Sequence, residues 1–437
     1  MKLGSKKNWI SNLAWYVLIG YYCLYEFTTP HTHINGVIVN VIVLLLLVFV
    51  AGLLFLKNFL GESAINARGL FWVPFIMVLF YQIMNYACAK SYFMLYVLFA
   101  LLIFFPIDKE ELWNLTLNTM KTMAVICAIG VFVHLFLPAI HEFIVSIYLN
   151  QEALKYIDSY VEKGYYSGFL HQVGDAAFYI TIGIIVTIFS DGKKLSKIAL
   201  IVFLTLALLL LGKRSVFVFL LIALLVTFVL LGKKGAKVIR LLSALVIGFI
   251  VLVIIRQLSM SLSDVKLFAK LADTFKFIEA GDISGLLESS GRESLYDLAM
   301  KLYQENSWFG IGWNEFVRIV SDRQGVITSV HNIYLQLLCE TGIVGLTAFL
   351  IGAITSLIMS LTNQGLIYKY KGNDKEKYSR MYAITVTGQI FFILFCFVEN
   401  PIYNENCLIF YFFAVLLSMS LKNKLRQELK TQARNTK

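Results

Sequence analysis

The sequence predicts an all-α polytopic membrane protein, and three observations support this fold class. Of the 437 residues, 59% are hydrophobic and only 15% are charged, and the mean hydropathy is +0.74. A soluble protein of this composition would expose apolar surface on a scale that causes aggregation. Apolar runs of about 20 residues, long enough to cross a bilayer, recur along the chain. The runs do not alternate between apolar and polar residues, which excludes a transmembrane β-barrel.

We expect twelve transmembrane helices, one for each apolar run. The first run lacks the small-residue cleavage site of a signal peptide, so we expect it to remain as a membrane anchor. In chain order, the expected spans are residues 9–27, 36–56, 69–87, 91–107, 122–140, 174–190, 196–211, 215–231, 238–255, 333–361, 381–398 and 405–421.

The distribution of Lys and Arg predicts the orientation of these spans. With both termini in the cytoplasm, 25 of the 38 basic residues lie in the termini and connections assigned to the inside. An excess of positive charge on cytoplasmic connections is the rule for multi-pass proteins. The formal charge of +11 therefore reflects topology, and we infer no nucleic-acid partner from it. The basic tail is expected to lie near anionic headgroups of the cytoplasmic membrane.

Two long outer connections organise the chain. Residues 1–255 hold the first nine spans and an outer loop at 141–173. Residues 256–332 form a large extracytoplasmic loop, and residues 333–437 hold the last three spans and the basic tail. Loops of this length are usually functional or disordered. Both contain regularly spaced aromatic and leucine residues, so we expect them to fold against the outer face and to carry the functional site.

The segment GYYSGFLHQVGDAAFYI, residues 164–180, leads into the sixth span. His171 and Asp175 are four residues apart and could share one helix face. They are interpreted as a hydrogen-bonded pair that shapes a substrate site, with a purely structural pair as the alternative.

The turn GKRSVF, residues 212–217, joins spans seven and eight on the outer side and breaks the charge rule with Lys213 and Arg214. One interpretation is a cationic clamp for a phosphate group, because a guanidinium offers a planar bidentate fork. The alternative is that both side chains reach to the membrane interface without binding a ligand.

The segment SSGRESLYDLAMKLYQ, residues 289–304, predicts an amphipathic surface helix. Ser290 and Glu293 have the spacing of a capping box. Arg292 would be the second residue of this helix, where a cation opposes the helix dipole and an anion is favoured. Arg292 is therefore a candidate anion-binding residue, with an ordinary solvated arginine as the alternative. The apolar residues that share one helix face are Leu295, Leu298 and Leu302.

The segment SWFGIGWNEF, residues 307–316, places two glycines among aromatic residues. Glycine at such spacing predicts a tight turn with a close approach of backbone segments. The aromatic side chains could stack on sugar rings or lie in the membrane interface.

The segment SVHNIYLQLLCETGIVGL, residues 329–346, starts the tenth span with polar residues. Asn332, Gln336 and Glu340 form one stripe on a helix, and His331 precedes it. Exposure of these groups to lipid would cost several kcal/mol each, so the stripe should face protein or a polar cavity. We expect it to line the inner wall of an outward-facing cavity and to contribute to the substrate-binding site. A neutral histidine at the rim could accept a proton. A headgroup-level histidine with a structural hydrogen bond is the alternative.

The sequence indicates no metal or cofactor. The cysteines form no C-x-x-C motif and do not lie near histidines in a metal-binding pattern. Glycine-rich phosphate loops and the HExxH motif are also missing from the sequence. The six cysteines, scattered in or beside apolar runs, are Cys23, Cys88, Cys127, Cys339, Cys396 and Cys407.

Taken together, these motifs resemble the bacterial O-antigen polymerase (Wzy) and O-antigen ligase superfamily. The resemblance rests on an outer arginine after a mid-chain span, a second arginine at a helix start in the long outer loop, the GIGWNEF turn and HNIYLQLLCETGIVGL. It implies a GT-C-like, metal-independent, inverting glycosyltransferase that takes a glycan from a polyprenyl-diphosphate carrier. The family's two arginines correspond to Arg214 and Arg292, and its histidine corresponds to His331. The implied partners are the lipid-linked oligosaccharide, membrane lipid, a flippase and a chain-length regulator.

The resemblance leaves the acceptor open. A polymerase of capsule, exopolysaccharide or O-antigen would transfer the glycan to another lipid-linked repeat unit, whereas a ligase would transfer it to lipid A–core or another acceptor. The chain has only 5 prolines and is rich in Lys, Ile, Phe and Tyr, which is typical of AT-rich genomes and favours the polymerase. A flippase or other transporter is a further alternative, but transporters usually carry their polar groups near the bilayer midplane. Here these groups gather at the outer ends of the spans.

Overall fold

The fold is an almost entirely helical bundle. We analysed a computed structural model of the chain, which describes residues 9–27, 31–33, 36–59, 69–105, 110–232, 234–261, 272–273, 275–276, 279–281, 292–324 and 328–435. Its α-helices are α1 (Trp9–Leu24), α2 (Gly36–Phe59), α3 (Val73–Asn85), α4 (Phe93–Phe104), α5 (Trp113–Phe136), α6 (Pro138–Ser146), α7 (Gln151–Glu162), α8 (Val173–Phe189), α9 (Lys194–Leu210), α10 (Arg214–Leu230), α11 (Lys237–Ser261), α14 (Glu293–Glu305), α15 (Glu315–Gln324), α16 (Ile333–Leu361), α17 (Asn363–Lys369), α18 (Lys375–Phe395) and α19 (Glu405–Asn435). Short 3₁₀ turns are η1 (Tyr25–Phe27), η2 (Gly69–Trp72), η3 (Cys88–Tyr92), η4 (Glu110–Leu112) and η5 (Lys234–Ala236).

A helix occupies each of the twelve predicted apolar runs. Four stretches within the described residues are both long and apolar enough to cross a membrane: Trp113–Phe136, Lys237–Ser261, Ile333–Lys369 and Glu405–Arg434. The other apolar helices are shorter. The helical prediction is therefore confirmed, and the chain has the character of a multi-pass membrane protein.

The predicted boundaries of the fifth span are wrong at both ends. Helix α5 begins at Trp113, within the predicted inner connection, because its first polar turns bury one face against the bundle. The Trp113 indole donates a hydrogen bond to Ser420 Oγ in α19 at 2.9 Å. At the other end, Pro138 cannot donate a backbone hydrogen bond and instead opens α6 as a separate helix.

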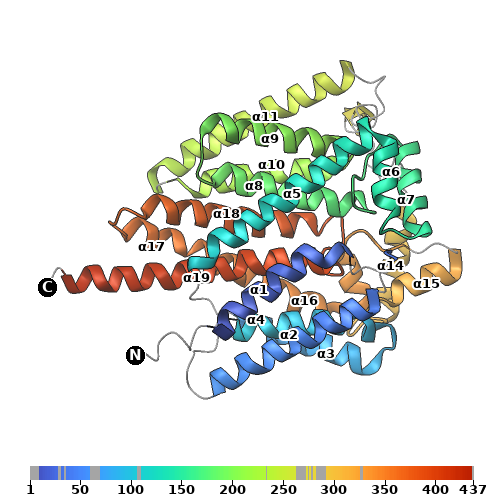
Figure 1. Cartoon of the computed structure of the whole chain (residues 1–437), viewed down its shortest axis with the longest axis horizontal. Coiled ribbons are helices and arrows are strands. Elements are labelled where there is room, and N and C mark those ends of the chain that lie inside the picture. The colour runs from blue at the N-terminus through green and yellow to red at the C-terminus, as the bar shows by residue number, and fades with distance from the viewer. Residues whose placement is uncertain are drawn as a thin grey trace.

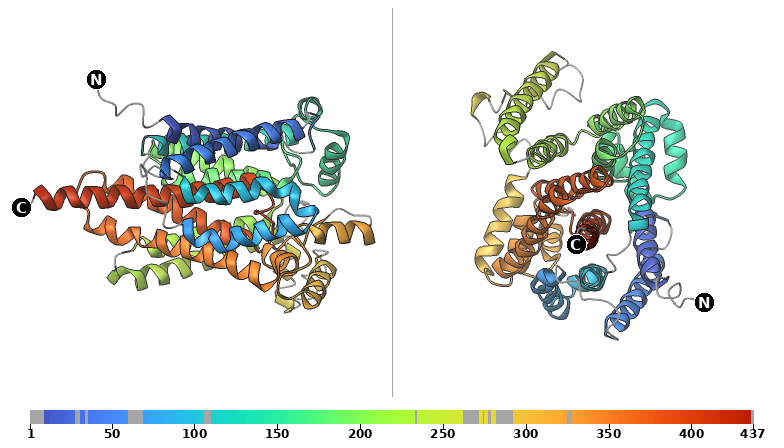
Figure 2. Two further views of the ribbon diagram at one scale, coloured as in Figure 1. Left: turned by 90° about the horizontal axis from the view of Figure 1, so that it is seen from below. Right: turned by 90° about the vertical axis from the view of Figure 1, so that its left-hand side faces the viewer.

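The long helices run roughly along one direction, and the bundle that they form has two distinct ends (Figure 1). Helices α6, α7, α14 and α15 lie at the end opposite the projecting C-terminal part of α19. Viewed along the bundle, α19 lies in the middle and other helices surround it (Figure 2). The apolar window of α19 is 83% buried by protein, whereas that of α11 at the periphery is 6% buried.

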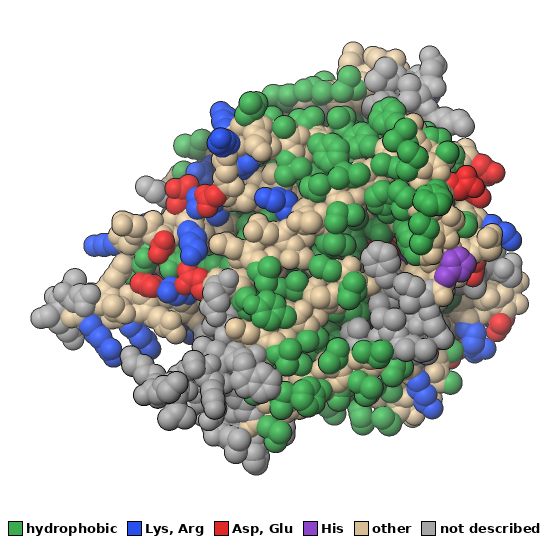
Figure 3. Space-filling model, viewed as in Figure 1, with side chains coloured by type: hydrophobic (Ala, Val, Ile, Leu, Met, Phe, Trp, Pro, Cys, Tyr) green, Lys and Arg blue, Asp and Glu red, His purple; other side chains and the backbone are tan. Residues whose placement is uncertain are grey.

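The surface supports a membrane setting. Apolar side chains cover most of the middle of the visible face, and charged side chains gather mainly toward the two ends (Figure 3). In the interior, polar side chains bond to one another across helices, as in Trp72 to Ser356 at 3.1 Å and Gln389 to Ser360 at 2.9 Å. Such pairing is required where water is excluded, because an unpaired polar group there costs several kcal/mol.

Candidate active site

His331 lies at the mouth of α16, in a backbone conformation that is unusual for a residue with a side chain. Its φ angle is +55°. Histidine adopts this left-handed region more readily than most residues, but it does so rarely, and such strain is common at functional sites. Asn332, the next residue, caps α16: its side chain accepts hydrogen bonds from the backbone N–H groups of Tyr334 at 3.0 Å and Leu335 at 3.2 Å. The predicted helix start is thus confirmed.

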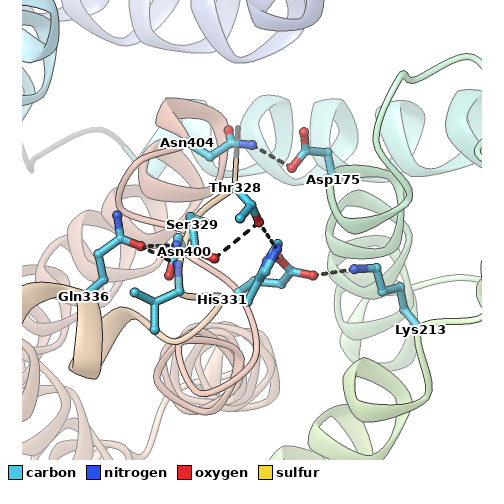
Figure 4. A network of polar contacts seen from close by, with 10 residues as sticks. Asp175, Lys213, Thr328, Ser329, His331, Gln336, Asn400 and Asn404 are labelled. Atoms are coloured by element: carbon cyan, nitrogen blue, oxygen red, sulfur yellow. Dashed lines mark hydrogen bonds and ion pairs between the residues drawn. The ribbon is translucent and has the colours of Figure 1, made fainter. Parts of the chain in front are cut away.

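The imidazole of His331 is partly accessible and is oriented by a carboxylate. Its side chain is 35% exposed, and Nδ1 lies 3.3 Å from Oε2 of Glu399 (Figure 4). The other ring nitrogen, Nε2, lies 3.5 Å from the hydroxyl of Thr328. Nδ1 is therefore held by a carboxylate, while Nε2 lies near the Thr328 hydroxyl at a longer distance.

Glu399 also binds Lys213, so one carboxylate joins two groups from different parts of the chain. Oε1 forms an ion pair with Lys213 Nζ, and 16% of the Glu399 side chain is exposed. Burial raises the pKa of Glu399, but the charge of Lys213 and the hydrogen bond with His331 outweigh it and hold the pKa well below its usual value. Glu399 is therefore ionised. The predicted phosphate-binding residue Lys213 has a protein carboxylate as its partner.

Gln336 and Glu340, predicted to line an outward-facing cavity, are buried at 1% and 0% exposure. Gln336 accepts hydrogen bonds from the backbone N–H of Val330 at 3.2 Å and from Asn400. It donates one to Glu340 Oε1 at 3.1 Å. The stripe faces the protein interior, as expected. Within the described residues, Gln336 and Glu340 form their hydrogen bonds with protein groups and do not line an open cavity.

Glu340 is the centre of a hydrogen-bond cluster that holds the glycine turn in place. Its carboxylate accepts hydrogen bonds from the backbone N–H groups of Asn314 at 2.8 Å and Phe316 at 3.3 Å, and from the hydroxyl of Tyr403. The ring of Tyr403 in turn stacks on Trp313, with centroids 4.4 Å apart. A buried carboxylate is tolerated here because several donors satisfy it.

The close backbone approach predicted for the glycine turn is confirmed. A Cβ on Gly310 would lie 2.2 Å from the carbonyl carbon of Glu340, so only glycine fits there. Helix α16 is interrupted at Gly342, whose φ of +67° is non-helical. The turn satisfies backbone groups that this break releases: Ile311 N–H donates to Cys339 O at 2.9 Å, and Ile343 N–H donates to Ser307 O at 2.9 Å. Such a break is allowed at membrane depth only where protein covers it.

His171 and Asp175, both described by the structure, do not pair with each other. His171 precedes α8, and its ring lies 4.3 Å from that of His31. Burial, and secondarily the charge of His31, lower the pKa of His171 to about 3. Asp175 lies in the first turn of α8 and accepts a hydrogen bond from Asn404 at 2.6 Å. The prediction of a direct pair is wrong because each side chain finds its partner on another segment.

The two predicted arginines lie at helix starts. Arg214 is the first residue of α10 and interacts electrostatically with Tyr165 and Asp273. Arg292, predicted to be the second residue of its helix, is the N-cap residue of α14, one position before the helix, and its side chain makes no capping bond. The proposed cap Ser290 lies outside the described residues. The predicted apolar face of α14 is confirmed, with Leu295 and Leu302 buried and Leu298 packed beside them.

Sequence reasoning missed the connection between α18 and α19. This segment, VENPIYNEN at residues 398–406, supplies Glu399, Asn400, Tyr403 and Asn404 to the polar network. Its composition could have identified it, since acidic and amide residues gather in this short link between two apolar runs.

An apolar cavity of about 390 Å³ lies between α3 and α16. It is lined mainly by hydrocarbon and adjoins the glycine turn through Trp308, whose side chain is 70% exposed. The cavity does not include His331. Its other lining residues are Pro74, Val78, Ile343, Val344, Thr347, Ala348 and Ile351.

Among the described residues, no group of three or more His, Cys, Asp or Glu side chains is placed to hold a metal ion. The features that the described residues offer for a reaction are an imidazole oriented by a carboxylate, two arginines at helix starts and an apolar cavity.

Comparison with known families identifies a match. Residues 199–350 match the family Wzy_C, described as O-Antigen ligase. The matched region includes Arg214, Arg292 and His331, and it confirms the resemblance to the O-antigen polymerase and ligase superfamily. No curated protein sequence matches the chain. The family implies a glycosyl-transfer-type activity in O-antigen or polysaccharide assembly, with a lipid-linked glycan as substrate in a membrane.

Proposed function

We propose that this protein is a polysaccharide polymerase that joins polyprenyl-diphosphate-linked oligosaccharide repeat units on the outer face of the cytoplasmic membrane. One observation carries the proposal: His331 lies within the matched region, is partly exposed, and has one ring nitrogen held by Glu399 while the other is near a hydroxyl. This is the arrangement that a general base needs. The product would be a capsule, an exopolysaccharide or an O-antigen.

In this mechanism His331 Nε2 accepts the proton of the attacking sugar hydroxyl. The hydroxyl oxygen forms a bond to the anomeric carbon as the bond from that carbon to the diphosphate oxygen breaks. The bonding electron pair leaves with the diphosphate, and inversion follows from attack on the opposite face. Arg214 and Arg292 would bind the diphosphate as its charge develops. No metal ion is required for these steps.

The proposed topology places twelve spans across the membrane and both termini in the cytoplasm. The end of the bundle that holds His331, α14 and α15 would then face outward, and the basic end of α19 would face inward. The positive charge of the predicted inner connections supports this orientation. A flippase that delivers the lipid-linked substrate and a chain-length regulator are the proposed partners.

The apolar cavity between α3 and α16 is proposed to hold part of the polyprenyl chain. Its hydrocarbon lining suits an isoprenoid, and it adjoins the turn that packs against the first half of α16. A lipid tail entering between the helices would leave the diphosphate at the polar end of the bundle.

An O-antigen ligase is the second candidate, and the description of the matched family favours it. The donor chemistry is the same in both cases, so the acceptor decides between them. Purified protein supplied only with lipid-linked repeat units should form a polymer ladder if it is a polymerase. A ligase would give no ladder and would transfer the glycan only when lipid A–core or another acceptor is added.

The mechanism predicts the effects of four substitutions. His331→Ala, Arg214→Ala and Arg292→Ala should each lower glycan transfer by about 10²-fold or more, because each removes a group that acts in the transition state. Arg292→Lys should remain impaired if a bidentate contact is needed. Transfer is measured from lipid-linked repeat units, with and without EDTA, and membrane insertion is checked for every variant.

A suitable control is Arg380→Ala, which removes an arginine at the other end of the bundle that pairs with Asp191 at 2.7 Å. This variant should retain transfer. Full product ladders from His331→Ala, Arg214→Ala and Arg292→Ala would refute the mechanism, and so would a strict requirement for a divalent metal.

A further inference from the structure

The connection between α18 and α19 is held firmly enough to position a catalytic group. The carbonyl of Cys396 accepts a hydrogen bond from Ile333 N–H at 2.9 Å, so the start of α16 is tied to the end of α18. The backbone N–H of Glu399 donates to Phe395 O at 3.1 Å, and that of Tyr403 donates to Asn400 O at 3.0 Å. Glu399 therefore projects from a backbone that is fixed relative to His331.

The Glu399 carboxylate determines which ring nitrogen of His331 carries the proton. An ionised carboxylate can only accept hydrogen bonds, so the nitrogen that faces it must be protonated. Nδ1 is that nitrogen, at 3.3 Å. In the neutral ring Nε2 then keeps its lone pair, on the side where Thr328 places a hydroxyl at 3.5 Å.

Lys213 pairs with the other oxygen of the same carboxylate, Oε1. The ion pair lies against the first turn of α8, where a Cβ on Gly174 would be 3.4 Å from Glu399 Oε1 and 3.7 Å from Lys213 Nζ. Lys213 is the N-cap residue of α10, directly before Arg214. The ammonium group of Lys213 is bound to Glu399, whereas Arg214 interacts electrostatically with Tyr165 and Asp273. The two neighbouring cations therefore have different roles.

We propose that Glu399 is the positioning residue of the general base His331, and that Lys213 acts through Glu399 rather than by binding the diphosphate. This inference rests on the proposed function, since it concerns the proton that His331 accepts. Glu399 fixes the ring so that Nε2 faces the acceptor hydroxyl. It then stabilises the imidazolium that forms, without taking up the proton itself, as the carboxylate does in serine-hydrolase triads. Lys213 limits this stabilisation, because its positive charge partly neutralises the carboxylate of Glu399.

Charged and titratable groups from all the packed elements could influence this pair. Those that interact with the Glu399 carboxylate are Lys213 before α10, His331 before α16, Tyr160 in α7, Asp175 in α8 and Cys407 in α19. Lys213 and His331 contact it directly, so substitutions at Lys213 and Glu399 should have the clearest effects on the pH dependence.

The experiment compares pH–rate profiles of Glu399→Gln and Lys213→Met in glycan transfer from lipid-linked repeat units. Glu399→Gln should lower kcat by about 10²-fold, within the usual range for general-base catalysis, and leave KM for the donor nearly unchanged. The acid limb of the pH–rate profile of Glu399→Gln should move to lower pH, because the imidazolium of His331 loses its neighbouring negative charge. Lys213→Met should move the acid limb to higher pH, because Glu399 then acts on His331 uncompensated. Glu399→Asp should recover part of the rate.

Lys377→Met is the matched control, since it removes a lysine that pairs with Glu110 at 2.6 Å in the other half of the bundle. Its pH profile should match that of the wild type. Unchanged profiles for Glu399→Gln and Lys213→Met would overturn the inference, as would a Lys213→Met variant whose main defect is a raised KM for the donor. If Glu399→Gln fails to fold, the pH–rate profiles of Glu399→Asp and Lys213→Met still test the proposed roles of Glu399 and Lys213. His331→Ala separates the two proposals, because an active His331→Ala would refute the proposed function itself.

Discussion

His331 and the polar stripe that follows it form one polar segment at the start of α16, and the two ends of this segment are built differently. At the N-terminal end His331 is 35% exposed, and its ring approaches Glu399 and Thr328 at 3.3 and 3.5 Å. Two turns further along, Glu340 is fully buried and accepts bonds from two backbone N–H groups and from Gln336 and Tyr403. Both residues are polar groups at the start of an apolar helix.

The difference indicates that one polar segment can serve both stability and the proposed proton transfer. Glu340 is saturated by protein donors, so it contributes to stability and holds the glycine turn against the break at Gly342. His331 has a partly exposed ring and a strained backbone, which suits a group that exchanges a proton. A stripe of this kind should therefore be examined residue by residue before all its members are assigned to substrate binding.

The largest expected effect that tests this contrast is at Glu340. Glu340→Gln should lower the free energy of unfolding by about 2–3 kcal/mol, because the new amide group faces donors that lose their acceptor. Thermal unfolding of the purified protein measures this, with His331→Ala as the matched variant that should unfold near the wild-type temperature. The contrast fails if Glu340→Gln is as stable as the wild type, or if His331→Ala is the less stable of the two.

A smaller effect is expected at Asn332, which lies between the two ends. Asn332→Ala should cost about 1 kcal/mol of stability, because the cap of α16 loses its side-chain acceptor. Asn332→Ser should restore most of that stability, since serine is an equally good cap. If Asn332→Ser is stable but inactive in glycan transfer, Asn332 contacts the substrate and the functional part of the stripe extends one residue further.

The smallest effect concerns a second histidine, His171, which is 5% exposed. Its pKa of about 3 lies below the ordinary value of about 6.5, so the folded state binds the proton less readily than the unfolded state. Stability should therefore be lost as the pH falls below about 6.5 toward 3. The melting temperature of His171→Gln should fall less between pH 7.5 and 5 than that of the wild type. An equal fall would mean that His171 does not contribute to this acid sensitivity.

The helices were predictable because long apolar runs are a local property of sequence. The start of α16 was also predictable, since Asn332 caps it within three residues. The beginning of α5 was not, because residues 113–121 are polar enough to resemble a connection and are recognised as helix only from the face they bury.

The partners of the site residues could not be predicted, because they are distant in sequence. His331 and Glu399 are 68 positions apart, and Lys213 and Glu399 are 186 apart. Spacing rules extend over a few turns of helix and carry no information on such pairs. His171 and Asp175 illustrate the converse, since a favourable spacing suggested a pair that tertiary contacts with His31 and Asn404 replace.

The central position of α19 has a consequence for biosynthesis. This helix follows all the other described helices in chain order, yet its apolar window is 83% buried among them. A ribosome releases the earlier helices first, so the bundle has to keep its centre open, or filled by lipid or a chaperone, until α19 arrives. The loop that carries Glu399 directly precedes α19 in the chain. The proposed glycan transfer would then depend on the insertion of the last described helix, α19.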